Sequence, residues 1–113
     1  MKEVMIILRP KMYFPTKDAL DQAGFHSMTI REIIGRGKCP VHYDYDEGAP
    51  VKYRLVAKRM IDMFVRDEDL QKLIDTVVEV NKTNHAGDGK IFVLPVNDAI
   101  RVRTGEKGIE AIM

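Results

Sequence analysis

A glycine-bearing turn late in the chain has residue types that suit an anion. It reads Gly87-Asp88-Gly89-Lys90, and an apolar segment follows it directly. Glycine reaches backbone angles that other residues avoid, exposed amide N–H groups in such a turn attract anions, and Lys90 adds a cation. Arg101 and Arg103 lie two residues apart, a spacing that places both side chains on one face of a strand. Together these residues favour a phosphate site, most simply for a nucleotide polyphosphate.

An ordinary structural explanation of the same residues stays open. Gly-Asp-Gly is common where a helix connects to a strand, and charged pairs often only face solvent. The spacing also differs from the P-loop and Rossmann glycine patterns, so neither of those mechanisms applies. A second cluster, Gly35-Arg36-Gly37-Lys38, again combines two glycines with two cations. Its spacing alone favours a solvated exit from a strand.

The bulk properties predict one domain, residues 1–113, and exclude several classes of protein. The 113 residues have a net charge of +1, with 45% hydrophobic and 31% charged residues. That balance suits a single folded domain and argues against a general nucleic-acid or membrane surface. No apolar run reaches the length of a membrane span, and the N-terminus lacks a signal-peptide pattern. Cys39 is the single cysteine, so an internal disulfide is excluded and a cytoplasmic location is expected.

Hydrophobic periodicity predicts the strands and helices that would position these residues. Strands are expected at residues 2–9, 27–34, 60–65 and 91–96, with a short one at 100–103, and helices at 15–23 and 67–81. Asp67 is expected to cap the second helix. Two strand–helix–strand halves indicate an α+β, ferredoxin-like βαββαβ sandwich with both helices on one sheet face. The other face is also fairly apolar, which favours an oligomer.

The segment between the second and third strands has no steady period and is long for a compact domain. Three tyrosines in it would suit the anchoring of a protein partner, namely Tyr43, Tyr45 and Tyr53. Cys39 and His42, with the nearby Asp44 and Asp46, have the types of metal ligands. One Cys and one His fall short of a zinc set, so no metal site is predicted.

Two separated motifs in the right order resemble the PII signal-transduction family, the trimeric sensors of nitrogen and energy status. The first runs from Thr83 through Gly87-Asp88-Gly89-Lys90 to Val93, and the second is the segment 100–106, Ile-Arg-Val-Arg-Thr-Gly-Glu. Residues 6–10 and 24–29 also match, so the resemblance spans nearly the whole chain. The Gly35-Arg36-Gly37-Lys38 form looks most like the branch encoded beside nitrogenase genes.

The resemblance implies that ATP or ADP binds in the cleft between two subunits of a homotrimer. The phosphates would be held by four cations, Lys38, Lys90, Arg101 and Arg103. Residues that would flank the adenine, partly through backbone groups, are Thr29, Asp62, Met63 and Phe64. Glycines would complete the site: Gly87 and Gly89, with Asp88 between them, would wrap the nucleotide, and Gly35 and Gly37 would meet the ribose or phosphates.

The resemblance also assigns residues 37–57 as the T-loop, the segment that docks into target proteins. Implied targets are nitrogenase, an ammonium transporter or a nitrogen-assimilation enzyme. The family commonly has Gln at the position of Cys39, where it helps hold magnesium and 2-oxoglutarate, and Cys is a weaker ligand for magnesium. Lys58, which in the family reaches the distal carboxylate of 2-oxoglutarate, is retained. Val51 stands at the position of the commonly modified tyrosine, so no uridylylation is expected.

The sequence therefore predicts a regulatory nucleotide sensor and not an enzyme. It lacks a convincing nucleophile–base pair or paired catalytic carboxylates, and its three histidines are scattered. The alternative is a PII-like sensor of another small ligand, such as bicarbonate, a metal or a different nucleotide, acting through the altered loop. Neither prediction involves nucleic acid or membrane insertion.

Overall fold

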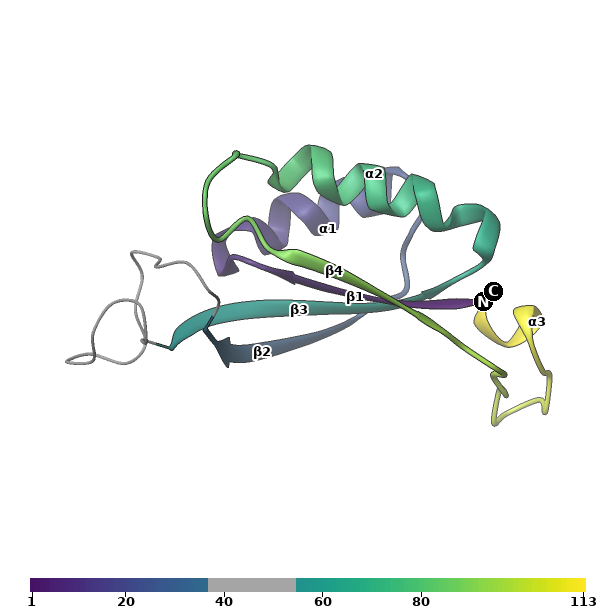
Figure 1. Cartoon of the computed structure of the whole chain (residues 1–113). Coiled ribbons are helices and arrows are strands. Elements are labelled where there is room, and N and C mark those ends of the chain that lie inside the picture. Colours follow the sequence, from purple (N-terminus) through teal and green to yellow (C-terminus); the bar gives the residue numbers. More distant parts are fainter. Residues whose placement is uncertain (37–54) are drawn as a thin grey trace.

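Four antiparallel strands form one sheet in the spatial order β2-β3-β1-β4 (Figure 1). The computed structural model of the chain describes residues 1–36 and 55–113. The strands are β1 (Lys2–Leu8), β2 (Thr29–Gly35), β3 (Val56–Val65) and β4 (Lys90–Pro95). Val4 in the central strand β1 lies opposite Met63 of β3 and Val93 of β4, which fixes the register of the three strands.

Two helices cover one face of this sheet, as the sequence predicts (Figure 1). They are α1 (Tyr13–Gln22), which follows the 3-10 turn η1 (Pro10–Met12), and α2 (Leu70–Asn81), which follows the 3-10 turn η3 (Asp67–Asp69). A short helix, α3 (Ile109–Ile112), ends the chain. The order βαββαβ confirms the α+β, ferredoxin-like sandwich. Val56 and Ala57, predicted to end the long loop, instead begin β3.

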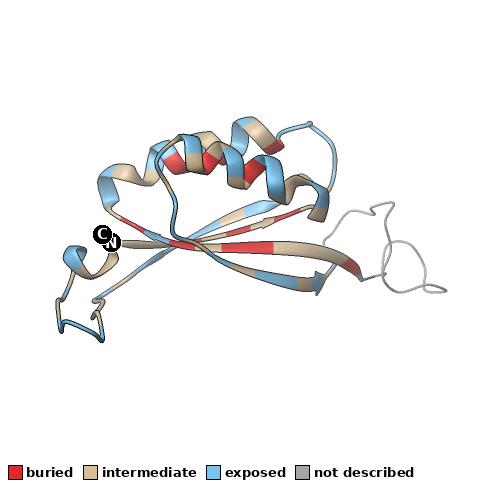
Figure 2. Ribbon diagram, turned by 180° about the vertical axis from the view of Figure 1, so that it is seen from behind, coloured by how far each residue is buried: buried red, intermediate tan, exposed pale blue. Residues whose placement is uncertain are grey.

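The core lies between the helices and the covered sheet face, because side chains alternate along a strand. The covered face contributes Val4, Ile6 and Leu8 from β1 and Ile61, Met63 and Val65 from β3, all buried. The helices contribute Leu20, Leu73 and Val77. Figure 2 shows buried positions in red on both the helices and the strands. Burying such a side chain fully contributes about 1.5–3 kcal/mol relative to exposure.

A glycine ends α1 and fixes the path into β2. Gly24 has φ +95°, a value that favours glycine. The Phe25 N–H donates to the Leu20 carbonyl at 2.8 Å and the Gly24 N–H donates to the Asp21 carbonyl at 3.1 Å, the pair of bonds that satisfies a helix C-terminus. Phe25 packs on the core cluster that contains Leu20. The glycine cap is therefore confirmed, and Phe25 packs on the same core as Leu20.

The predicted cap of α2 is wrong. Asp67 lies inside the turn η3, and its side chain accepts a hydrogen bond from the N-terminal amine at 3.0 Å instead of capping the helix. That contact holds the pKa of Asp67 below its usual value. At the start of the helix, a backbone N–H group is instead paired within the 3-10 turn. The Asp69 N–H donates to the Arg66 carbonyl at 3.0 Å. A tertiary charge contact has thus overridden a local sequence preference.

The predicted strand at 100–103 is also wrong. Ile100 makes one isolated bridge, to Lys107, and residues 102–104 form a turn. Gly105, at φ +74°, lets the chain fold back, so that its N–H donates to the Arg101 carbonyl at 2.7 Å. The Arg101 N–H donates to the Glu106 carbonyl at 2.9 Å. The segment therefore pairs with itself and does not extend the four-stranded sheet.

The second sheet face carries no helix among the described residues. Large apolar side chains lie on it, with Phe64 47% and Phe92 46% exposed. Glu3 and Asp62 share this face, because Met5 lies opposite both Phe92 and Asp62 and side chains directly opposite one another point the same way. The apolar character predicted for this face is therefore present in the structure.

Candidate functional site

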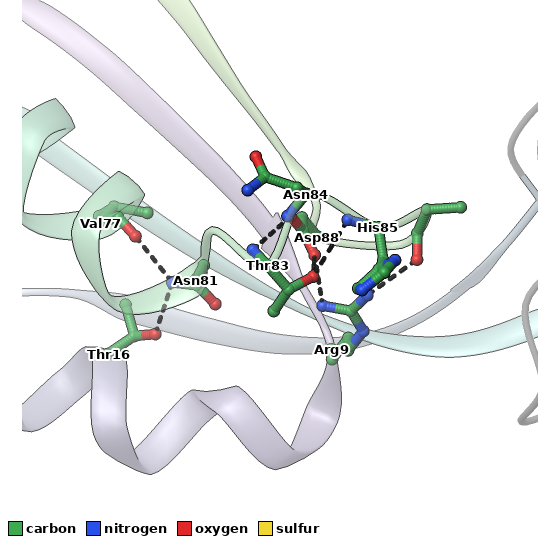
Figure 3. Close-up of polar contacts among 9 residues, drawn as sticks. Arg9, Thr16, Val77, Asn81, Thr83, Asn84, His85 and Asp88 are labelled. Atoms are coloured by element: carbon green, nitrogen blue, oxygen red, sulfur yellow. Dashed lines mark hydrogen bonds and ion pairs between the residues drawn. The ribbon is translucent and has the colours of Figure 1, made fainter.

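A network of hydrogen bonds centred on Asp88 fixes the glycine turn at the start of β4 (Figure 3). The Asp88 carboxylate accepts hydrogen bonds from Arg9 Nη1 at 2.9 Å, from the Thr83 N–H at 2.7 Å and from the Asn84 N–H at 3.1 Å. The Thr83 hydroxyl donates to it as well. These contacts, with the Thr83 hydroxyl contributing most, hold the pKa of Asp88 far below its usual range. Arg9 Nη2 also donates to the Ala86 carbonyl at 2.8 Å, so one arginine contacts the turn at two points.

Steric contact with β1 fixes the same turn from its other side. Gly87 and Gly89 have φ values of +94° and +112°. A Cβ atom at Gly89 would lie 2.1 Å from the Ile7 carbonyl oxygen, so the backbone itself occupies the space of a side chain. Lys90 follows at the first position of β4, directly opposite Ile7. The turn is therefore a rigid support for backbone N–H groups and for one lysine.

In the structure, the side chain of the predicted site residue Asp88 points into the turn. Its two oxygens already accept four hydrogen bonds from Arg9, Thr83 and Asn84. A carboxylate used in this way organises the loop and offers little to an anionic ligand. Lys90 differs, because its side chain is exposed and forms no ion pair with any residue in 1–36 or 55–113.

Arg101 is held by the C-terminal segment. Its Nη1 donates to Glu106 Oε1 at 2.9 Å, and its Nη2 donates to the Glu110 and Met113 carbonyls at 2.9 and 3.0 Å. A guanidinium has five N–H donors, so two remain for another partner. Arg103 lies in the exposed turn 102–104 and not beside Arg101 on a strand. The prediction that both arginines share a strand face is therefore wrong, because the backbone turns between them.

The predicted adenine residues lie together on neighbouring strands. Thr29, the first residue of β2, is directly opposite Asp62 of β3. Met63 is buried in the core, whereas Phe64 is on the open sheet face. Asp62 Oδ1 is buried and has no hydrogen-bond partner among the described residues. The nearby Asp62 carboxyl, followed by burial, raises the pKa of Glu3, while Arg31 lowers it.

The predicted site residues are spread along the sheet. Gly35, Lys58 and the turn 87–90 lie toward the end where β4 starts, whereas residues 101–103 follow the other end of β4, after Pro95. Thr29 and Asp62 lie between these ends, level with Phe92, because Met5 is opposite both Asp62 and Phe92. The strand β4 separates Lys90 from Pro95 by roughly 17 Å. One chain therefore does not bring Lys90 together with Arg101 and Arg103.

Three predicted residues lie outside the described residues, namely Gly37, Lys38 and Cys39. The metal-ligand interpretation that used Cys39 and His42 lies there too. Within 1–36 and 55–113, no group of three or more His, Cys, Asp or Glu side chains could hold a metal ion. Among these residues, no helix has both the length and the apolarity needed to cross a membrane.

Sequence reasoning missed the supporting residues Arg9 and Thr83. Both stand in motifs that carry the family resemblance, but neither was given a role. The spacing of Thr83 and Asp88 is a usable signal, because Thr and Asp side chains often bond to nearby backbone in turns. The contact between Arg9 and Asp88 joins positions 79 residues apart, so a single sequence gives no sign of it.

The fold and the turn define an α+β domain with one helix-covered sheet and a glycine turn that Arg9 and Thr83 hold in place. The chain belongs to the nitrogen regulatory protein P-II family, whose family model matches residues 1–106. The family resemblance found in the sequence is thereby confirmed.

Individual relatives agree with this assignment. A "nitrogen fixation nifHD region GlnB-like protein 2" of Methanobacterium ivanovii is 41% identical, with all of both chains covered. The protein of the same name from Methanothermobacter marburgensis is 42% identical, covering 99% of this chain and 100% of the relative. These names match the predicted nitrogenase-cluster branch. The crystal structure of Arabidopsis thaliana PII bound to citrate has a TM-score of 0.78 and 33% identity, covering 98% of this chain and 88% of that one.

Proposed function

We propose that this GlnB-like nitrogen regulatory protein binds ATP or ADP at the interfaces of a homotrimer. Occupation of those sites sets the conformation of the T-loop, residues 37–57, and thereby its affinity for a target. The target is a nitrogen-metabolism protein: nitrogenase, an ammonium transporter or a nitrogen-assimilation enzyme. A nucleotide acts in this way only by binding one loop conformation better than another, and it need not be turned over.

The observation that carries this proposal is the division of the site residues between the two ends of the sheet. One end offers the turn 87–90, with its exposed lysine and backbone N–H groups. The other offers the arginines 101 and 103, which follow Pro95, while Thr29 and Asp62 lie between the two ends. One copy keeps Lys90 about a strand length from these arginines, so a second copy is needed to bring cations from both ends to one set of phosphates. In the proposed site, Lys90 of one copy meets the phosphates beside Arg103 of another.

The exposed apolar sheet face supports assembly. Phe64, Phe92 and Leu94 are each more than a third exposed, although they sit on the strands that form the centre and one edge of the sheet. Monomeric proteins seldom leave such a face uncovered. In the proposed trimer, this face is buried against other copies.

Mixing of two defective variants tests the shared site directly. Lys90→Ala and Arg103→Ala should each weaken ATP binding in calorimetry, by roughly tenfold or more for the loss of a phosphate contact. When the two variants are unfolded and refolded together, some interfaces would combine an intact Lys90 from one copy with an intact Arg103 from another. Those interfaces should recover wild-type affinity. Lys107→Ala, which removes an exposed lysine four residues from Arg103, is the matched control.

The outcome of mixing separates the alternatives. Recovery of a wild-type-affinity fraction supports a site between copies. A mixture that binds no better than its two components, or a protein that sediments as a monomer, overturns the proposal. Unchanged affinity in both single variants would show that these cations do not hold the phosphates.

A second candidate function is a PII-like sensor of another small ligand, such as bicarbonate, a metal or a different nucleotide. It rests on Cys39, which stands where the resemblance places a glutamine that helps hold magnesium and 2-oxoglutarate. Lys58 is half-buried and lies toward the loop-side end of the sheet, where it would meet an acid bound there. Calorimetry with ATP, magnesium and 2-oxoglutarate distinguishes the two. Binding of 2-oxoglutarate that requires both ATP and magnesium, and is lost in Lys58→Ala, favours the nitrogen sensor.

A further inference from the structure

The C-terminal helix α3 holds one of the predicted phosphate cations, Arg101. After β4 the chain turns at 102–104 and returns, which places α3 beside the end of the sheet (Figure 1). Arg101 Nη2 donates to the Glu110 carbonyl at 2.9 Å and to the Met113 carbonyl at 3.0 Å. The last carbonyls of a helix have no partner within it, so the arginine supplies the donors that this helix end lacks.

These two bonds use the part of Arg101 that a phosphate needs most. A guanidinium has two edges that donate a pair of parallel N–H groups, Nη1 with Nη2 and Nε with Nη2, so Nη2 belongs to both. Nη2 has two hydrogens, and two carbonyls accept from it. While α3 is in place, neither edge of Arg101 is therefore left for a bidentate contact with a phosphate.

The same segment of chain also compensates the charge of Arg101. Glu106 Oε1 accepts a hydrogen bond from Arg101 Nη1 at 2.9 Å and forms an ion pair with it. Arg103 differs, because it is exposed and forms no ion pair with any residue in 1–36 or 55–113. An approaching anion is therefore attracted by Arg103, whereas Arg101 is neutralised by its own chain.

The packing of α3 allows it to be released. The helix has only four residues, Ile109–Ile112, and so short a helix is not stable by itself. Ile112 and Met113 line a cavity of about 410 Å³ together with Phe25 and Phe64. The helix thus covers a hollow and not a close-packed core, so its release breaks few contacts and leaves the sheet intact.

We propose that residues 109–113 form an autoinhibitory strap, which competes with the phosphates of a nucleotide for Arg101. With the strap closed, Arg103 is the arginine at this end that offers a free guanidinium edge, and release of the strap adds Arg101. This inference rests on the proposed function, because it requires phosphates to bind at these arginines. The coupling acts in both directions: whatever releases the strap raises the affinity for ATP, and ATP releases the strap.

Two isoleucine variants of the full chain test the strap. Ile112 is half-buried and lines the cavity, so Ile112→Ser should release the strap. Ile109→Ser is the matched control, because it makes the same change in the same helix at a side chain that is 40% exposed and does not line the cavity. Calorimetry with ATP should give a Kd that is lower by roughly fivefold or more in Ile112→Ser, and an unchanged Kd in Ile109→Ser.

Two further measurements show whether the effect passes through Arg101 and the strap. In an Arg101→Ala background, Ile112→Ser should add nothing, because the arginine that it would release is absent. Methyl NMR of the wild type follows the strap itself, since saturating ATP should move the Ile112 methyl signal toward the value of an unstructured isoleucine.

The outcomes separate a failure of the strap from a failure of the nucleotide site. A wild-type chain that binds no ATP overturns the proposed function and the strap with it. If the wild type binds ATP, the strap alone is overturned by equal affinities of Ile112→Ser and wild type, or by an equal gain in Ile109→Ser. A gain that persists in the Arg101→Ala background, or an Ile112 signal that ATP leaves unmoved, overturns it as well.

Discussion

The guanidinium of Arg9 and the carboxylate of Asp88 meet at 2.9 Å, although 79 residues separate them in the chain. Both side chains are mostly shielded from solvent, with Arg9 12% and Asp88 25% exposed. The pair connects the end of β1 to the turn that starts β4. Through it, the first strand of the fold controls the shape of the candidate phosphate turn.

Replacement of Arg9 tests that control. Arg9→Ala removes the contacts to Asp88 and to the Ala86 carbonyl, so the turn should lose order and ATP affinity should fall by roughly tenfold. Arg9→Lys should keep part of the charge interaction and lose less, because lysine cannot reproduce a two-point contact. Calorimetry gives the affinity, and hydrogen exchange of the amides at 83–89 reports the order of the turn. Unaltered exchange in Arg9→Ala would show that the turn holds its shape without this contact.

Gly89 gives a second, steric test of the same turn. In Gly89→Ala the new Cβ would lie 2.1 Å from the Ile7 carbonyl oxygen, and φ is +112°, so the first residues of β4 must shift. Gly105→Ala is the matched control, because its φ is also positive at +74° but nothing lies within 4 Å of the added atom. The control should cost about 1–2 kcal/mol from backbone strain alone. Thermal unfolding should show a lower Tm for Gly89→Ala than for Gly105→Ala, and equal values would mean that the close approach to β1 carries no penalty.

Local signals in the sequence were enough for the fold but not for the whole site. The apolar alternation of β1, the stripe of α2 and the glycine after α1 are short-range patterns, and each produced the predicted element. The prediction for Asp67 failed because a distant group, the N-terminal amine, binds its carboxylate. The prediction for 100–103 failed because the chain folds back at Gly105, where Arg101 bonds to Glu106 and to carbonyls of the C-terminal helix segment. The division of the site between two sheet ends follows from strand register, which no single segment encodes.

The carboxyl pair on the open sheet face predicts a pH dependence of stability. The nearby Asp62 carboxyl and burial raise the pKa of Glu3 in the folded state, so Glu3 contributes stability below its unfolded pKa and loses it as pH rises through the folded value. Arg31 opposes the shift without cancelling it. Glu3→Gln should therefore raise Tm at pH 7 and have little effect below about pH 4, where carboxyl groups are protonated.

The matched control for this variant is Glu79→Gln, which neutralises an exposed carboxylate on α2. Scanning calorimetry at pH 4 and pH 7 gives both differences. A gain at pH 7 that is as large in Glu79→Gln would reflect net charge, and a Glu3→Gln difference that does not change with pH would exclude titration of Glu3 as the cause.

The hydrogen bond from Asn81 to Thr16 joins the two helices on the covered face of the sheet. Thr16 is fully buried and Asn81 is 5% exposed, so Thr16→Val would leave an Nδ2 proton of Asn81 without this acceptor in an environment closed to water. The expected loss is about 1–3 kcal/mol in the free energy of unfolding, measured by urea denaturation.

Thr76→Val is the control, because its hydroxyl also donates to a carbonyl four residues earlier, that of Lys72, but in an exposed setting where water replaces the bond. If the two variants lose the same stability, the helix-to-helix bond contributes nothing beyond the loss of a hydroxyl. A larger loss in Thr16→Val, reduced in the double variant Thr16→Val with Asn81→Leu, would place the cost on the unpaired amide.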